Sequence, residues 1–179
     1  MSWHRVIRVV LVLGFLSGVV FLFQRYRRTP EQEELTHYVE QTVPWMRSRE
    51  RPIEAQLARL DERPGPKPEE ARKMLVDEVI PALLKLKKLA ADYHPNTAEV
   101  RELHQEYVKV TDRLIDAVRA CVQVIDDPKL STVDSVQRVR KEFADVNAAY
   151  RTWDDHVAGA CRLHRLAAPG TTPKAPAPP

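Results

Sequence analysis

The sequence predicts an all-α protein in which an N-terminal transmembrane helix is followed by an up-down-up-down four-helix bundle. The first observation is an apolar run at residues 6–23, which only Arg8 interrupts. The second is the balance of 5 glycines against 14 prolines in 179 residues, which suits long helices separated by breaks better than a sheet with many tight turns. The third is the recurrence of apolar residues every three or four positions in the second half of the chain.

The apolar run has the length and the flanks of a permanent membrane anchor. Its 18 residues, at about 1.5 Å each, nearly cross a hydrocarbon core roughly 30 Å thick. Arg8 lies close enough to one end to extend its head group to the interface. A cleavable secretion signal would end in small residues, whereas this run passes through Phe23 directly into Gln24 and Arg25. We therefore expect an anchor, and a buried core helix is the alternative that fits the charged flanks less well.

The charges around the anchor give its expected orientation. Arg5 and Arg8 lie on one side, and Arg25, Arg27 and Arg28 lie on the other, so the positive-inside rule is nearly balanced. A short basic tail before a first apolar segment is typical of a signal-anchor. We therefore expect a single-pass protein of the cell membrane, with a cytoplasmic amino terminus and an extracytoplasmic bundle.

Gly14 and Gly18 form the sequence G-F-L-S-G inside the anchor. The four-residue spacing places both glycines on one helix face, where two backbones can approach closely. We therefore expect a helix–helix interaction site at this pair and a homodimer in the membrane. The alternative is that glycine is simply common in membrane helices.

Prolines divide the rest of the chain into four stretches of about 30 residues, each near 45 Å long if helical. They occur at Pro30, in the P-G-P-K-P run at 64–68, and at Pro95, Pro128 and Pro169. Short connections make consecutive helices antiparallel, which gives the up-down-up-down order. The last segment is rich in proline and alanine and has little apolar surface to bury. The expected domains are a membrane anchor at 1–28, a helical bundle at 29–168 and a disordered tail at 169–179.

The third and fourth stretches carry the clearest bundle pattern, with apolar residues alternating by three and four positions. The positions between them are mostly charged, as on the solvent face of an amphipathic helix. The expected seam residues are Val100, Leu103, Tyr107, Val110, Leu114, Ala117, Cys121 and Val124, followed by Val136, Val139, Phe143, Val146, Tyr150, Trp153, Val157 and Ala160.

The first two stretches are interrupted by prolines that correspond in position. The sequence Y-V-E-Q-T-V-P-W-M at 38–46 is similar to L-V-D-E-V-I-P-A-L at 75–83, so Pro44 and Pro81 are expected to kink the two helices at similar heights. Two prolines tolerated through tertiary packing are the alternative. Pro52 has no counterpart and is expected to begin a new segment of the first helix.

The sequence contains none of the common phosphate-binding, nucleophile-elbow or metalloprotease motifs. We therefore expect no catalytic residues, no cofactor and no enzymatic activity. A formal charge of +3 is close to balance, and the basic run K-L-K-K at 85–88 has no interleaved aromatic residues, so we expect no nucleic-acid partner.

Five histidines are expected at the membrane-proximal end of the bundle, together with Cys161. A single E-x-x-H occurs at residues 34–37, whereas a di-iron bundle needs two, so we expect no metal site. Cys121 and Cys161 should lie about 35 Å apart along the last hairpin, beyond the reach of a disulfide. The histidines are His37, His94, His104, His156 and His164.

These observations favour a single-pass, membrane-anchored helical bundle that acts as an interaction or assembly module without catalysis. Its expected partners are the lipid bilayer and either a second protein or another copy of the chain. The alternative is a sensor-like bundle at the membrane surface that binds a small ligand between its kinked helices, or a metal or haem at its histidine-rich end.

Overall fold

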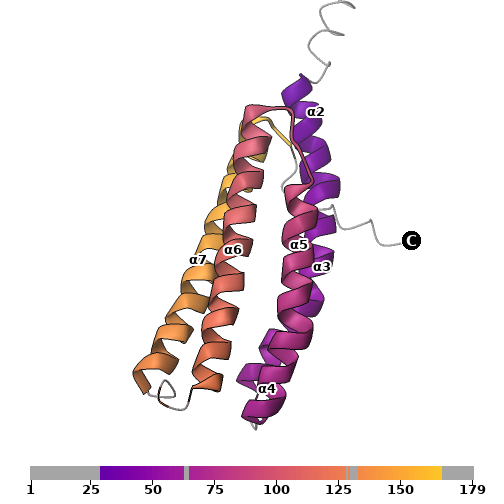
Figure 1. Cartoon of the computed structure of the whole chain (residues 1–179). Helices are drawn as coiled ribbons and strands as arrows, with labels where there is room; N and C mark the ends of the chain where they lie inside the picture. The colour runs from indigo at the N-terminus through magenta and orange to yellow at the C-terminus, as the bar shows by residue number, and fades with distance from the viewer. Residues whose placement is uncertain (1–28, 63–64, 128, 130–132, 167–179) are drawn as a thin grey trace, which may run out of the picture.

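The computed structural model describes residues 29–62, 65–127, 129 and 133–166. All regular secondary structure in these ranges is helical, which confirms the predicted all-α class. Four rods pack side by side and run alternately down and up, as Figure 1 shows. None of the helices in these ranges is long and apolar enough to cross a membrane. The expected anchor, with Gly14 and Gly18, and the expected tail at 169–179 lie outside the described residues.

Each rod begins and ends close to the predicted proline boundaries. The first rod contains α2 (Pro30–His37), a π-helical turn η1 (Tyr38–Thr42), α3 (Val43–Ala58) and a 3₁₀ turn η2 (Arg59–Asp61). The second rod contains α4 (Pro68–Met74), a π-helical turn η3 (Leu75–Val79) and α5 (Ile80–Ala91). The third rod is α6 (Ala98–Asp126), and the fourth is α7 (Val133–Leu163).

The paired prolines of the first two rods each follow a π-helical turn. Pro44 and Pro81 cannot donate a backbone hydrogen bond, and the preceding residues Val43 and Ile80 donate to carbonyls five positions back. The wider turn accommodates a proline ring within a continuous rod, so irregularities occur at both expected positions. The prediction for Pro52 is wrong, because it lies inside α3. The buried neighbours Glu50 and Ile53 hold this part of the helix against the bundle despite the lost bond.

Capping contacts fix the ends of the rods. The Thr29 hydroxyl accepts from the Gln32 backbone N–H at 3.2 Å, and the Gln32 side chain accepts from the Thr29 N–H at 3.1 Å, forming a capping box. At the start of α6 the N-cap residue Thr97 makes no side-chain capping bond, and a residue of another rod supplies the capping contact. The Glu34 carboxylate accepts from the backbone N–H groups of Asn96 and Thr97, both at 2.6 Å. A carboxylate at this position suits the positive end of the α6 dipole.

The buried side chains form an upper and a lower cluster, named by their positions in Figure 1. Trp153 is the largest fully buried side chain, and its indole N–H donates to the Leu103 carbonyl at 2.8 Å. The upper cluster contains Leu35, Tyr38, Val39, Val43, Met46, Ala90, Val100, Leu103, Tyr107, Trp153, Val157, Ala160 and Cys161. The lower cluster contains Ile53, Met74, Leu75, Val79, Leu83, Leu86, Val110, Leu114, Ile115, Ala117, Val118 and Val146.

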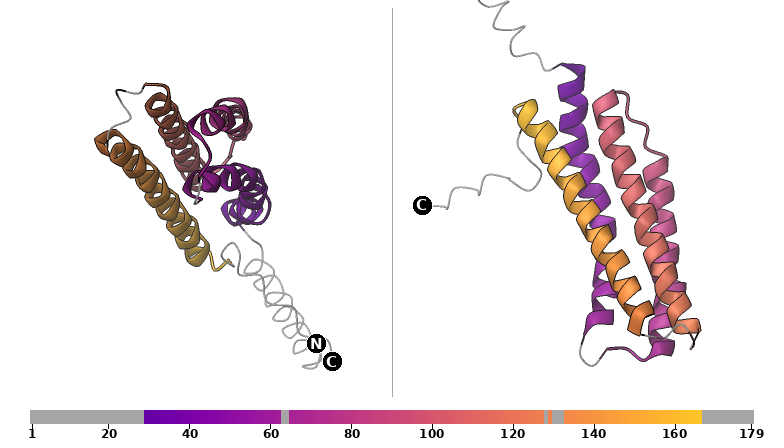
Figure 2. Two further views of the ribbon diagram at one scale, coloured as in Figure 1. Left: turned by 90° about the horizontal axis from the view of Figure 1, so that it is seen from below. Right: turned by 90° about the vertical axis from the view of Figure 1, so that its left-hand side faces the viewer.

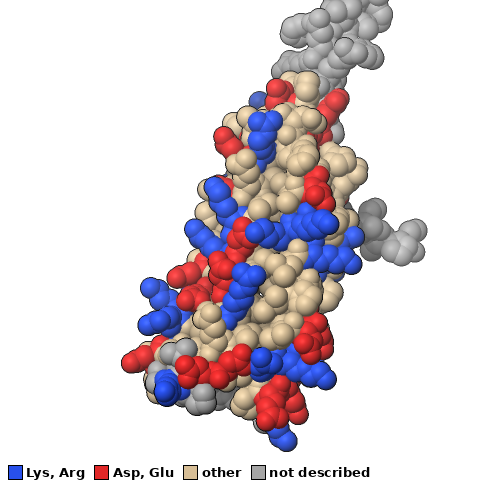
Figure 3. All heavy atoms as spheres, in the orientation of Figure 1, with Lys and Arg blue, Asp and Glu red and all other residues tan. Residues whose placement is uncertain are grey.

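Charged side chains of both signs are intermixed on the face shown in Figure 3. Across the second and third rods, Lys87 pairs with Asp112 at 2.6 Å and Arg72 pairs with Asp126. These pairs are about half exposed, so each contributes little to stability. The close packing of α5, α6 and the upper part of α7 therefore depends mainly on the apolar clusters.

Candidate functional site

The main departure from a closed bundle is a groove between the lower parts of α3 and α7. In the view from below in Figure 2, α7 is inclined to the other rods and its first turns lie apart from α3. The groove has a volume of about 980 Å³. Its walls include Ile53 and Leu57 from α3 and Val139 and Phe143 from α7. Its floor includes Leu83 from α5 and Leu114, Cys121 and Ile125 from α6.

Burial along α7 shows where the predicted seam opens. Trp153 and Val157 in the upper half are each 1% exposed, as the seam pattern predicts. In the lower half, Val136 is 37% exposed and Val139 and Phe143 are only partly buried. The expectation of a continuously buried seam is therefore wrong for residues 136–143 of α7, because α3 does not reach their apolar face, whereas the next seam residue, Val146, is buried as predicted.

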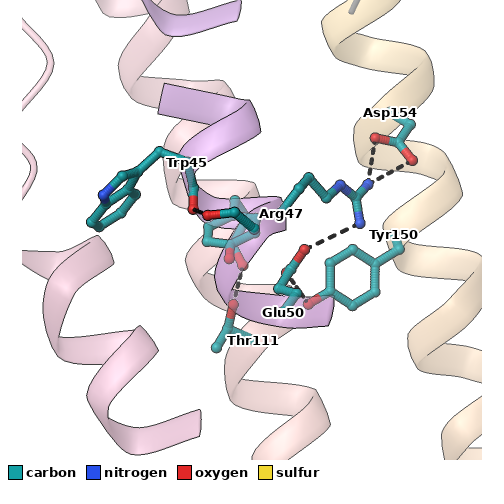
Figure 4. Close-up of polar contacts among 8 residues, drawn as sticks. Trp45, Arg47, Glu50, Thr111, Tyr150 and Asp154 are labelled. Atoms are coloured by element: carbon teal, nitrogen blue, oxygen red, sulfur yellow. Dashed lines mark hydrogen bonds and ion pairs between the residues drawn. The ribbon is translucent and has the colours of Figure 1, made fainter. Parts of the chain in front are cut away.

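A buried polar cluster closes the upper end of the groove, and Figure 4 shows its contacts. Glu50 lines the groove and is only 3% exposed. The Tyr150 hydroxyl donates to one Glu50 oxygen at 2.7 Å, and Arg47 donates to the other at 3.3 Å. Arg47 also donates to both oxygens of Asp154, at 2.7 and 2.9 Å. One guanidinium therefore serves two carboxylates that come from different helices.

The electrostatics of this cluster hold its proton donors in place. Burial and the nearby Glu50 charge raise the pKa of the Tyr150 hydroxyl, so it remains a donor at neutral pH. Burial opposes the charge on Arg47, but Glu50 and Asp154 outweigh that effect and raise the pKa of Arg47. Burial and Glu50 likewise raise the pKa of Tyr107, whose buried hydroxyl has no hydrogen-bond partner. The cluster thus has an unused donor beside a buried carboxylate.

Sequence reasoning identified Tyr150 only as a seam residue and missed Arg47 and Glu50. A signal was present, because Glu50 lies four residues after Met46 and three before Ile53. Met46 and Ile53 are both buried, so the spacing places a carboxylate on the apolar face of the helix. A charged residue at such a position needs a buried partner or a function.

The histidines have separate environments. His37 and His94 are exposed, His156 pairs with Glu106 at 2.8 Å, and His164 pairs with Glu99 at 2.7 Å. His104 is buried, with Nε2 at 2.8 Å from the Ala90 carbonyl and Nδ1 at 3.4 Å from the Tyr38 hydroxyl. Across the described ranges, no group of three or more His, Cys, Asp or Glu side chains is arranged to hold a metal ion.

His104 is expected to make folding stability depend on pH. Burial, together with the nearby His94, lowers the pKa of His104 below its ordinary value of 6.5. The unfolded chain then binds a proton at this site more readily than the folded chain does, so the His104 contribution is complete above about pH 6.5 and is lost as the pH falls. Replacing His104 by Gln should flatten this part of the profile, measured as thermal unfolding of the full-length protein in mild detergent. An unchanged profile in H104Q would contradict the prediction.

The two cysteines are free thiols, and they differ in location. Cys121 is partly buried and lies on the groove floor, whereas Cys161 is fully buried in the upper cluster. Burial raises the pKa of the Cys121 thiol, so its thiolate is scarce at neutral pH and its alkylation is slow. Cys121 is therefore a built-in reporter of groove occupancy.

The groove and its polar end must be interpreted from their own geometry. No protein-family model, no curated protein and no solved structure matches the chain.

Proposed function

We propose that this protein is a membrane-anchored helical bundle that acts as an interaction module, without catalytic activity, and that its partner binds in the groove between α3 and α7. The observation that carries the proposal is the groove itself, about 980 Å³ in volume and lined by apolar side chains from all four rods. Leaving such surface open to water costs roughly 25 cal/mol for each Å². An apolar hollow with a few convergent polar groups is a typical binding site in helical bundles.

The position of the groove suits a partner that approaches from solution. Residues 6–23 would anchor the chain through the start of α2 at Pro30, at the upper end of the bundle in Figure 1. The groove lies between the lower parts of α3 and α7, at the opposite end. The bundle would therefore hold its binding site away from the bilayer, on the extracytoplasmic side in the proposed orientation.

A small ligand is the second candidate for the partner, and the buried Glu50–Tyr150 pair favours it. The volume lies near the upper end of the usual range for small-molecule sites, roughly 300–1,000 Å³. A single polar group at one end of an apolar hollow can fix the orientation of a small ligand. The metal or haem alternative has no comparable observation among the described residues.

Photo-crosslinking from inside the groove tests this proposal. A photoreactive residue at Ala144, an exposed groove-lining position on α7, should give a discrete adduct in native membranes. The matched control is Leu84, which is 43% exposed on α5 and lies outside the groove lining. The added substitution Val139→Trp should fill the groove and reduce the Ala144 adduct several-fold.

Mass spectrometry of the Ala144 adduct separates the candidates. A protein mass identifies a protein partner, a doubled mass identifies a second copy of this chain, and a small added mass identifies a ligand. Equal adducts from Ala144 and Leu84, no adduct from Ala144, or full retention of the adduct after Val139→Trp would overturn the groove as the binding site.

A further inference from the structure

We infer that the groove between α3 and α7 takes a cationic amphiphile, with an alkyl chain along the apolar walls and an ammonium head group against Glu50. The inference rests on the second candidate of the proposed function, a small ligand, because it names the occupant of the same groove.

The charges around the groove favour a cation. Glu50 and Glu54 line the α3 wall, whereas Arg140 lines the α7 wall. Just above Glu50, Arg47 is shared between Glu50 and Asp154. Arg140 comes ten residues before Tyr150, the α7 residue that contacts Glu50, so it lies about 15 Å lower along the groove. The upper end therefore has three carboxylates, those of Glu50, Glu54 and Asp154, against the one guanidinium of Arg47. An anionic head group placed here would face a buried carboxylate, which is strongly unfavourable.

The polar end also has hydrogen-bonding capacity to spare. The two Glu50 oxygens accept one bond each, from Tyr150 and Arg47. An ionised carboxylate has about four acceptor sites, so one site remains for a further donor even when the neighbouring Tyr107 hydroxyl takes the third. An ammonium group supplies donors and the opposite charge together, which makes the contact a charge-assisted hydrogen bond.

The shape of the groove suits a chain with one polar end. Along α3 and η2 the lining extends from Glu50 to Leu60, ten residues or roughly 15 Å, which matches a medium-length alkyl group. The walls below Glu50 include Ile53, Leu57 and Phe143. An amphipathic helix would place its polar side chains along its solvent side, whereas the carboxylates that line this groove, Glu50 and Glu54, lie towards one closed end. The head-and-tail arrangement therefore favours an amphiphile over a partner helix.

Competition between head groups tests the inference in the full-length protein, reconstituted in phosphatidylcholine nanodiscs. The probes are decylammonium, decanol and decanoate, which share one chain and differ in the head group. The readout is the rate of Cys121 alkylation, quantified by mass spectrometry, with Cys161 as the internal reference. Decylammonium should protect Cys121 at a concentration about tenfold or more below that needed for the other two probes, as expected for one charge-assisted hydrogen bond.

Two variants and one control assign that preference to the groove. Glu50→Gln keeps an acceptor for Tyr150 but removes the charge, so the preference for decylammonium should largely disappear. Glu54→Gln changes an exposed groove residue with little risk to folding, and it should reduce the preference partly. Glu102→Gln, on the exposed face of α6 outside the groove lining, should leave the preference unchanged.

In the native chain, shortening the ammonium probe from decyl to octyl should weaken protection by about fourfold for each methylene lost.

The outcomes separate this inference from the proposed function. Equal protection by all three head groups, better protection by decanoate, or an unchanged preference in both Glu50→Gln and Glu54→Gln would overturn the cationic amphiphile. An absence of protection combined with a protein adduct from Ala144 would overturn the inference and leave the groove as a protein-binding site. An absence of both protection and adduct would overturn the inference and the proposed function together.

Discussion

Replacing Trp153 by alanine is expected to lower the free energy of unfolding by about 3–5 kcal/mol, the largest effect of a single substitution in the described part of the bundle. Trp153 is 1% exposed, packs against Tyr107 at 5.1 Å between ring centroids, and donates its indole N–H to the Leu103 carbonyl. The substitution removes both contacts and leaves a cavity between α6 and α7. Thermal unfolding of the full-length protein in mild detergent, followed by circular dichroism, should show a fall in Tm of roughly 10 °C.

Two further variants separate the contributions of the indole ring. Trp153→Phe keeps an aromatic ring but loses the hydrogen bond to Leu103, so it should cost about 1–2 kcal/mol. Trp45→Ala is the matched control, because Trp45 is only partly buried and Arg49 lies over its ring at 4.1 Å. It should destabilise the protein much less than Trp153→Ala. Equal losses from the two alanine substitutions would show that the upper cluster is not organised around Trp153.

Rod boundaries were predictable because they depend on local chemistry. Pro30 and Pro68 occupy first helical positions, where the missing N–H costs nothing. The repeat along α6 also predicted its buried face correctly, from Val100 to Ala117. Helical periodicity determines which side chains share a face, and α6 is central enough that neighbouring rods cover that face.

The same periodicity failed at the lower half of α7 for a physical reason. A three-and-four repeat shows which face of a helix is apolar, but it does not show whether another helix lies close enough to cover that face. Val136 and Phe143 follow the repeat as well as Trp153 and Val157 do, yet only the second pair is buried. The inclination of α7 is a tertiary property, so the groove could not be predicted from the sequence of α7 alone.

The buried polar residues of the interior were also not predicted from the sequence. His104 and Glu50 are each at least 95% buried, and both form hydrogen bonds with residues distant in sequence. Their partners, Tyr38 and Tyr150, lie 66 and 100 positions away. Sequence spacing can mark a polar residue on an apolar face, as it does for Glu50, but only the packed structure identifies the group that satisfies it.

Replacing Arg47 by alanine is expected to lower the free energy of unfolding by about 2–4 kcal/mol, because it leaves Glu50 buried without its cation. Glu50 would keep only the Tyr150 hydroxyl among its present partners, and the Arg47 stem and guanidinium would no longer pack over the Tyr150 and Trp153 rings. The effect should lie below that of a fully buried pair, since the Arg47 side chain is 30% exposed. Thermal unfolding of the full-length Arg47→Ala variant in mild detergent, followed by circular dichroism, measures this loss of stability.

A double-mutant cycle assigns the Arg47 effect to the buried carboxylate. If an uncompensated Glu50 charge causes the loss, then Arg47→Ala combined with Glu50→Gln should be more stable than Arg47→Ala alone by about 1 kcal/mol or more. Arg49→Ala on the same helix is the matched control. Arg49 is exposed, donates to the Trp45 carbonyl and lies over the Trp45 ring, so its removal should cost about 0.5–1 kcal/mol. A double variant no more stable than Arg47→Ala would mean that Arg47 acts through its packing on Tyr150 and Trp153, and the upper end of the groove would then lack the electrostatic character on which recognition of a cation depends.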